Sequence, residues 1–252
     1  MKNHSRIDEE PFKLDHHIAL WTTDAPYDIK GQFWNLSTER TLIHEIGQGS
    51  VVKTYQQPHP PIVITAVEPF SGGVTAAARG WEPISANFLL PQWVKSHWGK
   101  YVEGCKQGNR PADPANWRVA KTVFVSEDAA TARRYGLGED SPHRFYCRQL
   151  LHKMRRAGRL NLFKAQKDLP DEMVTVDSVV DQLVIAGTPD EVAEQLLEFR
   201  EQIGDFGTLL YCGIDWADAA LGKRSLELMA EKVMPAVNAE IKRSERVTSF
   251  AA

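Results

Sequence analysis

The chain has 252 residues, of which 42% are hydrophobic and 25% are charged, and its formal net charge is -3. This composition is typical of a soluble globular protein, and it excludes collagens, coiled coils and long disordered tails. A nearly neutral chain has no general electrostatic attraction to nucleic acid or to anionic membranes. The length fits one or two domains, or a single α/β barrel of roughly 250 residues.

Three cysteines, Cys105, Cys147 and Cys212, lie far apart and form no CxxC pair. Neither a disulfide framework nor a zinc site is therefore expected. The first ten residues are polar, unlike a signal peptide, and no apolar run approaches the ~20 residues of a membrane span. We expect a reduced, cytoplasmic protein that holds no metal.

The N-terminal segment, residues 1–57, contains a short amphipathic piece that ends at residues 18–21. Residues 31–36 alternate apolar and polar side chains, which is typical of a strand. Residues 51–55 can pair with this strand in a hairpin, because the flexible stretch at residues 47–50 lies between the two.

The pattern changes at the proline-rich residues 58–61, which force an extended backbone. Residues 62–67 are β-branched and almost continuously apolar, which predicts a strand buried on both faces. A glycine-containing turn and an alanine-rich helix over residues 74–79 follow, and Gly80 suits the end of that helix. Residues 84–88 are the next predicted strand.

Pro91 opens a predicted helix that runs to about Cys105, with Trp93, Val94, Trp98, Tyr101 and Val102 on one face. Residues 117–125 form a long predicted strand. Ser126 is the predicted N-cap of the next helix, with Asp128 in its first turn.

Residues 140–182 form a long, largely helical stretch whose segment 143–159 is basic. This segment is either a solvated face or a lid whose arginines meet a ligand. Thr188 and Glu191 predict a capping box with Pro189 in the first helical position. The buried stripe of that helix is Val192, Leu196, Phe199 and Ile203.

Two further elements follow, a buried strand at residues 207–212 and an amphipathic helix at residues 225–237. Strands and helices therefore alternate from residue 60 onward, which predicts βα units around a parallel sheet. Only about four good parallel strands are present, whereas a closed barrel requires about eight.

One strand–turn–helix unit, residues 62–79, has the composition of an anion site. Its turn contains Ser71, Gly72 and Gly73, whose backbone N–H groups and hydroxyl can bind a phosphate. A tight turn that merely needs glycine explains the same residues. No zinc-protease motif, nucleophile elbow or phosphate-binding P-loop is present in the sequence.

Several short motifs resemble the bacterial luciferase-like, flavin-dependent monooxygenases. They are QPHPPI at residues 57–62, AAARG at 76–80, IAGTPDEVA at 185–193 and MAEKVMP at 229–235. Residues 31–35, 83–88 and 206–211 are most similar to the limonene 1,2-monooxygenase branch. Together these segments extend over most of residues 18–238.

The family fold is a (β/α)₈ barrel of the TIM type, and the resemblance identifies the predicted strands as its fifth to eighth. The first four strands have no counterpart in this chain, which therefore resembles the C-terminal part of an incomplete barrel. The resemblance implies flavin-site βα units at residues 58–139, an insertion after the seventh strand at residues 140–182, and the last strand and C-terminal helices at residues 183–252.

The resemblance also implies two sets of site residues and no catalytic residue of the protein itself. The flavin phosphate and ring would contact Val67, Glu68, Ser71, Gly72, Gly73, Ser85, Ala86 and Asn87. Arg118 and Lys121 would be charges of the substrate pocket. Phe88 and Trp216 are further pocket candidates, because they lie near the carboxyl ends of predicted strands, where pockets form. Pro69 stands where relatives often have serine, which removes one hydroxyl and one N–H donor from the phosphate turn.

The activity implied by the resemblance is oxygen transfer to a small apolar, terpene-like substrate. Reduced FMN from a separate NAD(P)H-dependent reductase and O₂ would be consumed, and the protein would be a homo-oligomer. Two alternatives stay open: an F420-dependent oxidoreductase of the same barrel family, and a non-catalytic remnant that needs a partner chain to fold. The second follows from the missing strands, because an open half-barrel leaves two unpaired edges.

Overall fold

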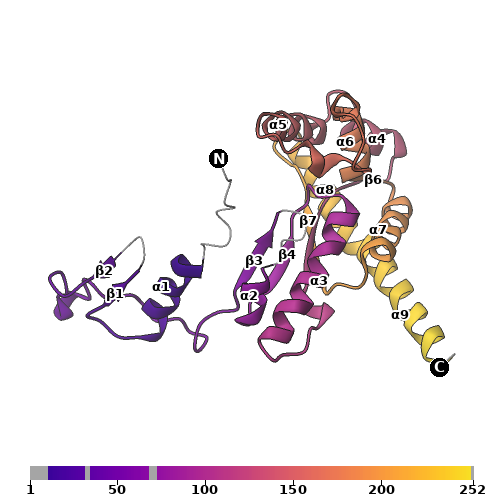
Figure 1. The fold of residues 1–252 in the computed structure, drawn as a ribbon. Helices are drawn as coiled ribbons and strands as arrows, with labels where there is room; N and C mark the ends of the chain where they lie inside the picture. Colours follow the sequence, from indigo (N-terminus) through magenta and orange to yellow (C-terminus); the bar gives the residue numbers. More distant parts are fainter. Residues whose placement is uncertain (1–10, 32–34, 68–72, 251–252) are drawn as a thin grey trace. The chain divides into compact units, whose positions relative to one another are not determined.

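The structure, a computed structural model, describes residues 11–31, 35–67 and 73–250. The chain divides into two compact units, residues 1–62 and residues 63–252. Figure 1 labels their helices and strands. Among the described residues, no helix combines the length and the apolar character needed to cross a membrane.

The first unit contains a helix, α1 (Pro11–Thr22), and an antiparallel hairpin of β1 (Asp28–Lys30) and β2 (Asn35–Ser37). A single turn of 3₁₀ helix, η1 (His44–Ile46), follows. Tyr27 is 3% exposed, and its backbone N–H donates to Thr38 Oγ1 over 2.9 Å.

The predicted pairing of residues 31–36 with residues 51–55 is wrong. The strand β2 pairs with β1 instead, so that Ile29 lies opposite Leu36. Closing this shorter loop has a smaller entropic cost than bringing residues 51–55 to the strand. The turn near residue 48 forms only an isolated bridge between Ile43 and Gln48.

The second unit contains a five-stranded parallel sheet with the order β3-β4-β5-β6, in which β7 also pairs with β5. The strands are β3 (Val63–Ala66), β4 (Glu82–Ser85), β5 (Arg118–Val125), β6 (Val184–Gly187) and β7 (Thr208–Cys212). The first half of β5 pairs with β4 and β7, and its second half pairs with β6. The edges of β3 and β7 do not meet, so the described residues form an open part of a barrel.

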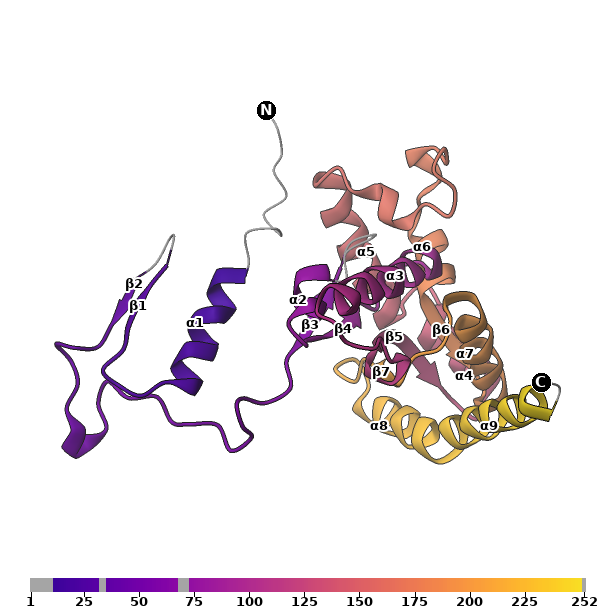
Figure 2. The same ribbon diagram turned by 60° about the horizontal axis from the view of Figure 1, so that its bottom comes forward.

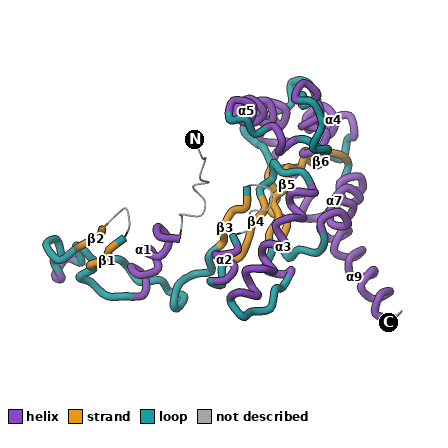
Figure 3. Tube along the Cα trace, in the orientation of Figure 1, coloured by secondary structure: helices purple, strands orange, loops and turns teal. Residues whose placement is uncertain are grey.

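Helices connect these strands, as Figure 3 shows by colour. They are α2 (Val74–Ala78), α3 (Pro91–Gln107), α4 (Ala129–Leu137), α5 (Pro142–Arg156), α6 (Val176–Leu183), α7 (Pro189–Ile203), α8 (Ala219–Leu228) and α9 (Met234–Phe250). Single turns of 3₁₀ helix lie at η2 (Pro114–Asn116), η3 (Leu160–Phe163) and η4 (Asp171–Met173), and a π-helical turn, η5 (Met229–Val233), joins α8 to α9. In Figure 2, α8 and α9 form one long rod that passes α7.

The alternation of side chains gives the sheet a helix-covered face and an open face. On the helix-covered face, Ser85 contacts His97 of α3, Lys121 contacts Phe199 of α7, and Tyr211 contacts Ser225 of α8. The register places Val63, Glu82, Arg118 and Leu210 on the other face. Val63 is 37% exposed and Leu210 is 47% exposed, so this face is open.

Of three apolar clusters on the helix side of the unit, two are large. The larger one joins β5 to α3, α5, α6 and α7, and includes Leu90, Trp117, Leu151, Val180 and Phe199. The second lies where β5 and β6 end, and includes Val125, Ile185, Leu196, Met229 and Val233. The core therefore sits behind the sheet and not inside a closed barrel.

Several predictions about these elements are confirmed. The helix α3 begins at Pro91, and α7 has the complete capping box of Thr188 and Glu191. The predicted stripe of α7 is buried. The stretch of residues 140–182 is largely helical, as its composition predicts.

Other predictions are wrong for identifiable reasons. The strands β3 and β7 are half-exposed and not buried on both faces, because each pairs with one neighbour only. Asp128, and not Ser126, caps α4, since the helix begins at Ala129 and the Asp128 carboxylate accepts from the Thr131 N–H. Val102 is 38% exposed, whereas His97 takes a buried position on α3.

Candidate functional site

Polar side chains gather at the carboxyl edge of the sheet, where β4, β5 and β7 approach one another. Asn87 follows β4 by two residues, and its Nδ2 donates to Thr122 Oγ1 of β5 over 2.9 Å. Thr122 lies opposite Cys212, the last residue of β7. Parallel α/β sheets bind ligands at this edge, so these residues define the candidate site.

Tyr146 of α5 reaches the same place. Burial raises the pKa of the Tyr146 hydroxyl above its usual value, and the hydrogen bond with the Asn87 side chain lowers this pKa in part. Burial likewise raises the pKa of the Cys212 thiol. We call these four residues, Asn87, Thr122, Tyr146 and Cys212, the carboxyl-edge cluster. All four are uncharged at neutral pH, so the cluster suits a neutral ligand surface.

An exposed aromatic pair lies next to this cluster along the chain. Phe145 of α5 and Trp216 of the β7–α8 loop meet edge to face, with ring centroids 5.9 Å apart. Their exposed fractions are 50% and 67%. The Tyr135 hydroxyl donates to the carbonyl of Ile214 and thereby ties the β7–α8 loop to α4. Large exposed aromatics of this kind typically contact a ligand or another protein surface.

The residues predicted for the flavin phosphate are only partly described. Glu68, Ser71 and Gly72 lie outside the described residues. Val67 packs against the larger apolar cluster. Gly73 has φ 60°, and a Cβ at this position would lie 2.9 Å from the Cβ of Ala76, so a glycine is required there.

Ser85, predicted to lie beside the flavin ring, has its side chain on the helix-covered face. Its Oγ lies 2.8 Å from His97 Nδ1 and accepts a hydrogen bond from Trp117 Nε1 over 3.0 Å. Ser85 and His97 are both fully buried. The distance resembles that of a nucleophile and its base, but without access to ligand this network stabilises the packing of α3 on the sheet.

Ala86 belongs to the larger apolar cluster, and Phe88 packs against it. Of the predicted residues near the flavin ring, Asn87 is therefore the one that the structure brings into the carboxyl-edge cluster.

The two predicted pocket charges, Arg118 and Lys121, lie on opposite faces of β5. Arg118 forms an ion pair with Glu82 on the open face. Lys121 is 3% exposed on the helix-covered face, with its Nζ 4.8 Å from the centroid of the Phe199 ring. A spacing of three residues cannot place both side chains on one face of a strand, because the strand period is two.

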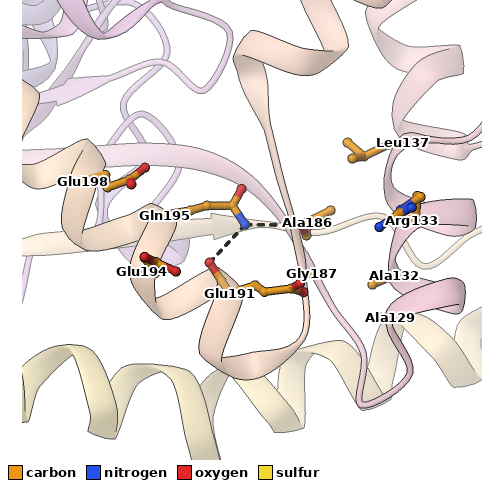
Figure 4. Close-up of a pocket in the computed structure, with 10 residues that line it drawn as sticks. All are labelled: Ala129, Ala132, Arg133, Leu137, Ala186, Gly187, Glu191, Glu194, Gln195 and Glu198. Atoms are coloured by element: carbon orange, nitrogen blue, oxygen red, sulfur yellow. Dashed lines mark hydrogen bonds between the residues drawn. The ribbon is translucent and has the colours of Figure 1, made fainter.

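A separate hollow of about 370 Å³ lies between α4 and α7. Figure 4 shows Arg133 and Leu137 on one side and Glu194 and Glu198 on the other. Gln195 Nε2 donates to the carbonyls of Ala186 and Glu191. None of the predicted site residues lines this hollow, so it is not the candidate site.

Sequence reasoning missed Thr122, Tyr146, Cys212 and Phe145. Thr122 shares its face of β5 with Arg118, so the strand period was a usable signal for it. Tyr146 and Phe145 lie in the basic helix that the sequence alone assigns either to a solvated face or to a lid, and no local pattern distinguishes these two residues from their neighbours.

The comparison with known families decides the identification. The family described as "Luciferase-like monooxygenase" matches residues 15–205, which is most of the chain. The chain belongs to the luciferase-like monooxygenase family. This confirms the family inferred from the sequence motifs.

Two monooxygenases are among the relatives to which the chain is similar. The chain is 26% identical over 226 residues to 3,6-diketocamphane 1,6-monooxygenase of Pseudomonas putida, covering 86% of this chain and 58% of the relative. It is also 26% identical over 152 residues to limonene 1,2-monooxygenase of Rhodococcus erythropolis, covering 59% of this chain and 35% of the relative. The chain thus spans 58% of the length of the first relative and 35% of the length of the second.

Two solved structures share the fold of this chain. The FMN complex of the oxygenating constituent of 3,6-diketocamphane monooxygenase matches with a TM-score of 0.73 and 25% identity, over 94% of this chain and 64% of that chain. An F420-dependent secondary alcohol dehydrogenase matches with a TM-score of 0.53 and 17% identity, over 87% of this chain and 58% of that chain. The expected fold, part of a luciferase-like α/β barrel, is confirmed.

Proposed function

We propose that the chain functions in a flavin-dependent monooxygenase that transfers one oxygen atom from O₂ to a small apolar substrate of the terpene type. The observation that carries this proposal is the match, over 94% of this chain, to the FMN complex of the oxygenating constituent of 3,6-diketocamphane monooxygenase. Reduced FMN from a separate reductase is the proposed cofactor. When bound, it supplies the activation of O₂ that protein side chains do not provide.

The residues at the carboxyl edge fit a flavin ring. The ring is uncharged along much of its edge and offers nitrogen and oxygen atoms for hydrogen bonds, and Asn87, Thr122 and Tyr146 are neutral donors and acceptors. The hydrogen bond from Asn87 Nδ2 to Thr122 Oγ1 holds the side-chain amide of Asn87 in one orientation. Phe145 and Trp216 offer apolar surface that excludes water from a reacting pocket.

In this proposal Val67 and Gly73 approach the flavin phosphate together with Glu68, Ser71 and Gly72. The helix α2 has only five residues, so its dipole contributes little to binding of the phosphate. Phe88, Arg118 and Trp216 are the proposed substrate-side residues. Lys121 is left out, because its side chain occupies the helix-covered face.

The open sheet favours a second candidate, a chain that completes its barrel only with a partner. Val63 and Leu210 expose apolar side chains on the edge strands β3 and β7. Unpaired parallel edges invite association. A homo-oligomer is consistent with this candidate, and light scattering on the purified chain measures it.

Replacing Ser71 by Asp should weaken FMN binding roughly tenfold or more, because a carboxylate repels the phosphate at short range. Riboflavin carries the same ring without the phosphate, so its affinity should change little. Titration of both flavins, followed by flavin fluorescence, measures the difference.

Ser71→Ala is the matched control, since it removes the hydroxyl without adding charge. If Ser71→Asp weakened the binding of riboflavin as much as that of FMN, the substitution would not act through the phosphate, and the proposed phosphate site would be wrong. Failure of the wild-type chain to bind FMN, with tight binding of F420, would favour the F420-dependent alternative.

A further inference from the structure

A cavity on the helix-covered face lies apart from the carboxyl-edge cluster. It has a volume of about 350 Å³ and lies where the start of α3, the end of α6 and the middle of α7 meet β5. Its lining includes Leu90, Lys121, Val184, Ile185, Phe199 and Gln195. Ligand pockets in proteins begin at about this size. We call it the Lys121 cavity.

The ammonium group of Lys121 has no counterion in this cavity. Lys121 is 3% exposed, and its described contact is the Phe199 ring, 4.8 Å from Nζ. No ion pair joins Lys121 to any described carboxylate. Burying an unpaired charge is costly, so the site gains from any anion that reaches Nζ.

The other hydrogen-bond donors of the cavity are mostly occupied. Gln92 Nε2 donates to the carbonyls of Lys164 and Ala165. Gln182 Nε2 donates to the carbonyl of Ser178, and Gln195 Nε2 donates to those of Ala186 and Glu191. Lys121 is therefore the cationic donor that this cavity offers to a ligand.

The walls and the rim restrict the ligand further. Leu90, Val184, Ile185 and Phe199 are buried apolar side chains. The titratable groups that line the cavity besides Lys121 are Asp181 at the end of α6 and Glu198 of α7, both exposed at the rim, while α3 contributes the uncharged Gln92. Two carboxylates at the rim repel anions with several charges more strongly than anions with one.

We propose that the Lys121 cavity binds a small monocarboxylate with an apolar body, whose carboxylate pairs with the Lys121 ammonium group. The apolar walls contact the body of the ligand, and the acidic rim selects against phosphate and dicarboxylates. The site does not depend on the flavin function proposed above, because it uses the other face of the sheet.

Binding of benzoate to the full chain tests this proposal, with benzamide as its uncharged counterpart. Isothermal titration should detect benzoate at millimolar concentration near neutral pH, and benzamide should bind at least roughly tenfold more weakly, as expected for a charge-assisted contact. Phthalate, a dianion of similar body, should also bind more weakly. Because burial lowers the pKa of Lys121 to about 8, benzoate affinity should fall above this pH.

Lys121→Met is the decisive variant, and Lys100→Met is its control, since Lys100 is an exposed lysine paired with Glu103. The first should lose benzoate binding and the second should retain it. Equal affinity for benzoate in Lys121→Met, equal affinity for benzamide in the wild type, or no detectable benzoate binding would each overturn the proposal. If Lys121→Met does not fold, the loss of affinity above the pKa in the wild type decides the question.

Discussion

Replacing Lys121 by Met should make the ligand-free protein more stable at neutral pH. Burial lowers the pKa of Lys121 from 10.5 in the unfolded chain to about 8 in the folded protein. The folded protein therefore binds the ammonium proton of Lys121 less tightly than the unfolded chain does. The corresponding cost at neutral pH is about 3 kcal/mol. Loss of the Lys121–Phe199 contact offsets part of the gain, which leaves about 2 kcal/mol.

The sign of the effect follows from proton linkage. Between the folded and unfolded pKa values of Lys121 the unfolded state binds more protons, so the free energy of unfolding of the wild type rises with pH. Below this window the cost is fully present, and above it the cost is gone. The advantage of Lys121→Met should therefore be largest at neutral pH and vanish in strong alkali.

Urea unfolding of the wild type, Lys121→Met and Lys100→Met measures this effect. The exposed Lys100–Glu103 pair contributes little, so Lys100→Met should stay close to the wild type. A Lys121→Met variant that is less stable than the wild type at neutral pH would contradict the unpaired state of the ammonium group.

Replacing His143 by Phe should remove much of the acid sensitivity of the fold. His143 is fully buried near Phe124 and Tyr135, and neither ring nitrogen has a hydrogen-bond partner. Burial lowers the pKa of His143 from 6.5 to about 4. As pH falls through this window, the unfolded state takes up a proton that the folded state does not.

The wild type should therefore lose about 3 kcal/mol of unfolding free energy through His143 between these two pKa values. His143→Phe should lack this loss, and its aromatic neighbours suit a phenyl ring. Thermal unfolding at about pH 5 and about pH 7 separates the variants.

His152 lies on the same helix but is exposed, so His152→Gln is the matched control and should keep the acid sensitivity of the wild type. Equal acid sensitivity in His143→Phe would show that other groups cause it.

Local sequence patterns were sufficient for individual elements of the fold. The Thr188–Glu191 capping box and the apolar stripe of α7 were predictable because both depend on neighbours within a few residues. The partial barrel was predictable from the count of strands. The exposure of Val63 and Leu210 was not predictable. An apolar sequence predicts a strand, but it does not show whether the strand has a neighbour on one side or on both sides.

The candidate site was less predictable than the fold. Asn87, Thr122, Tyr146 and Cys212 come from four separate elements, and their meeting depends on the order and register of the sheet. The position of Lys121 was predictable in part, because its spacing from Arg118 assigns the two side chains to opposite faces. Its cavity depends on how α3, α6 and α7 pack, which no local pattern specifies.

Oxygen transfer under isotopically labelled O₂ tests the central claim most directly. The purified chain would receive FMN, a flavin reductase and NADH, with limonene and a bicyclic terpene ketone as substrates. The account predicts one labelled oxygen atom in the product, dependent on both the chain and reduced FMN. A chain that binds FMN but gives no labelled product from either substrate, or a product whose new oxygen comes from water, would contradict it.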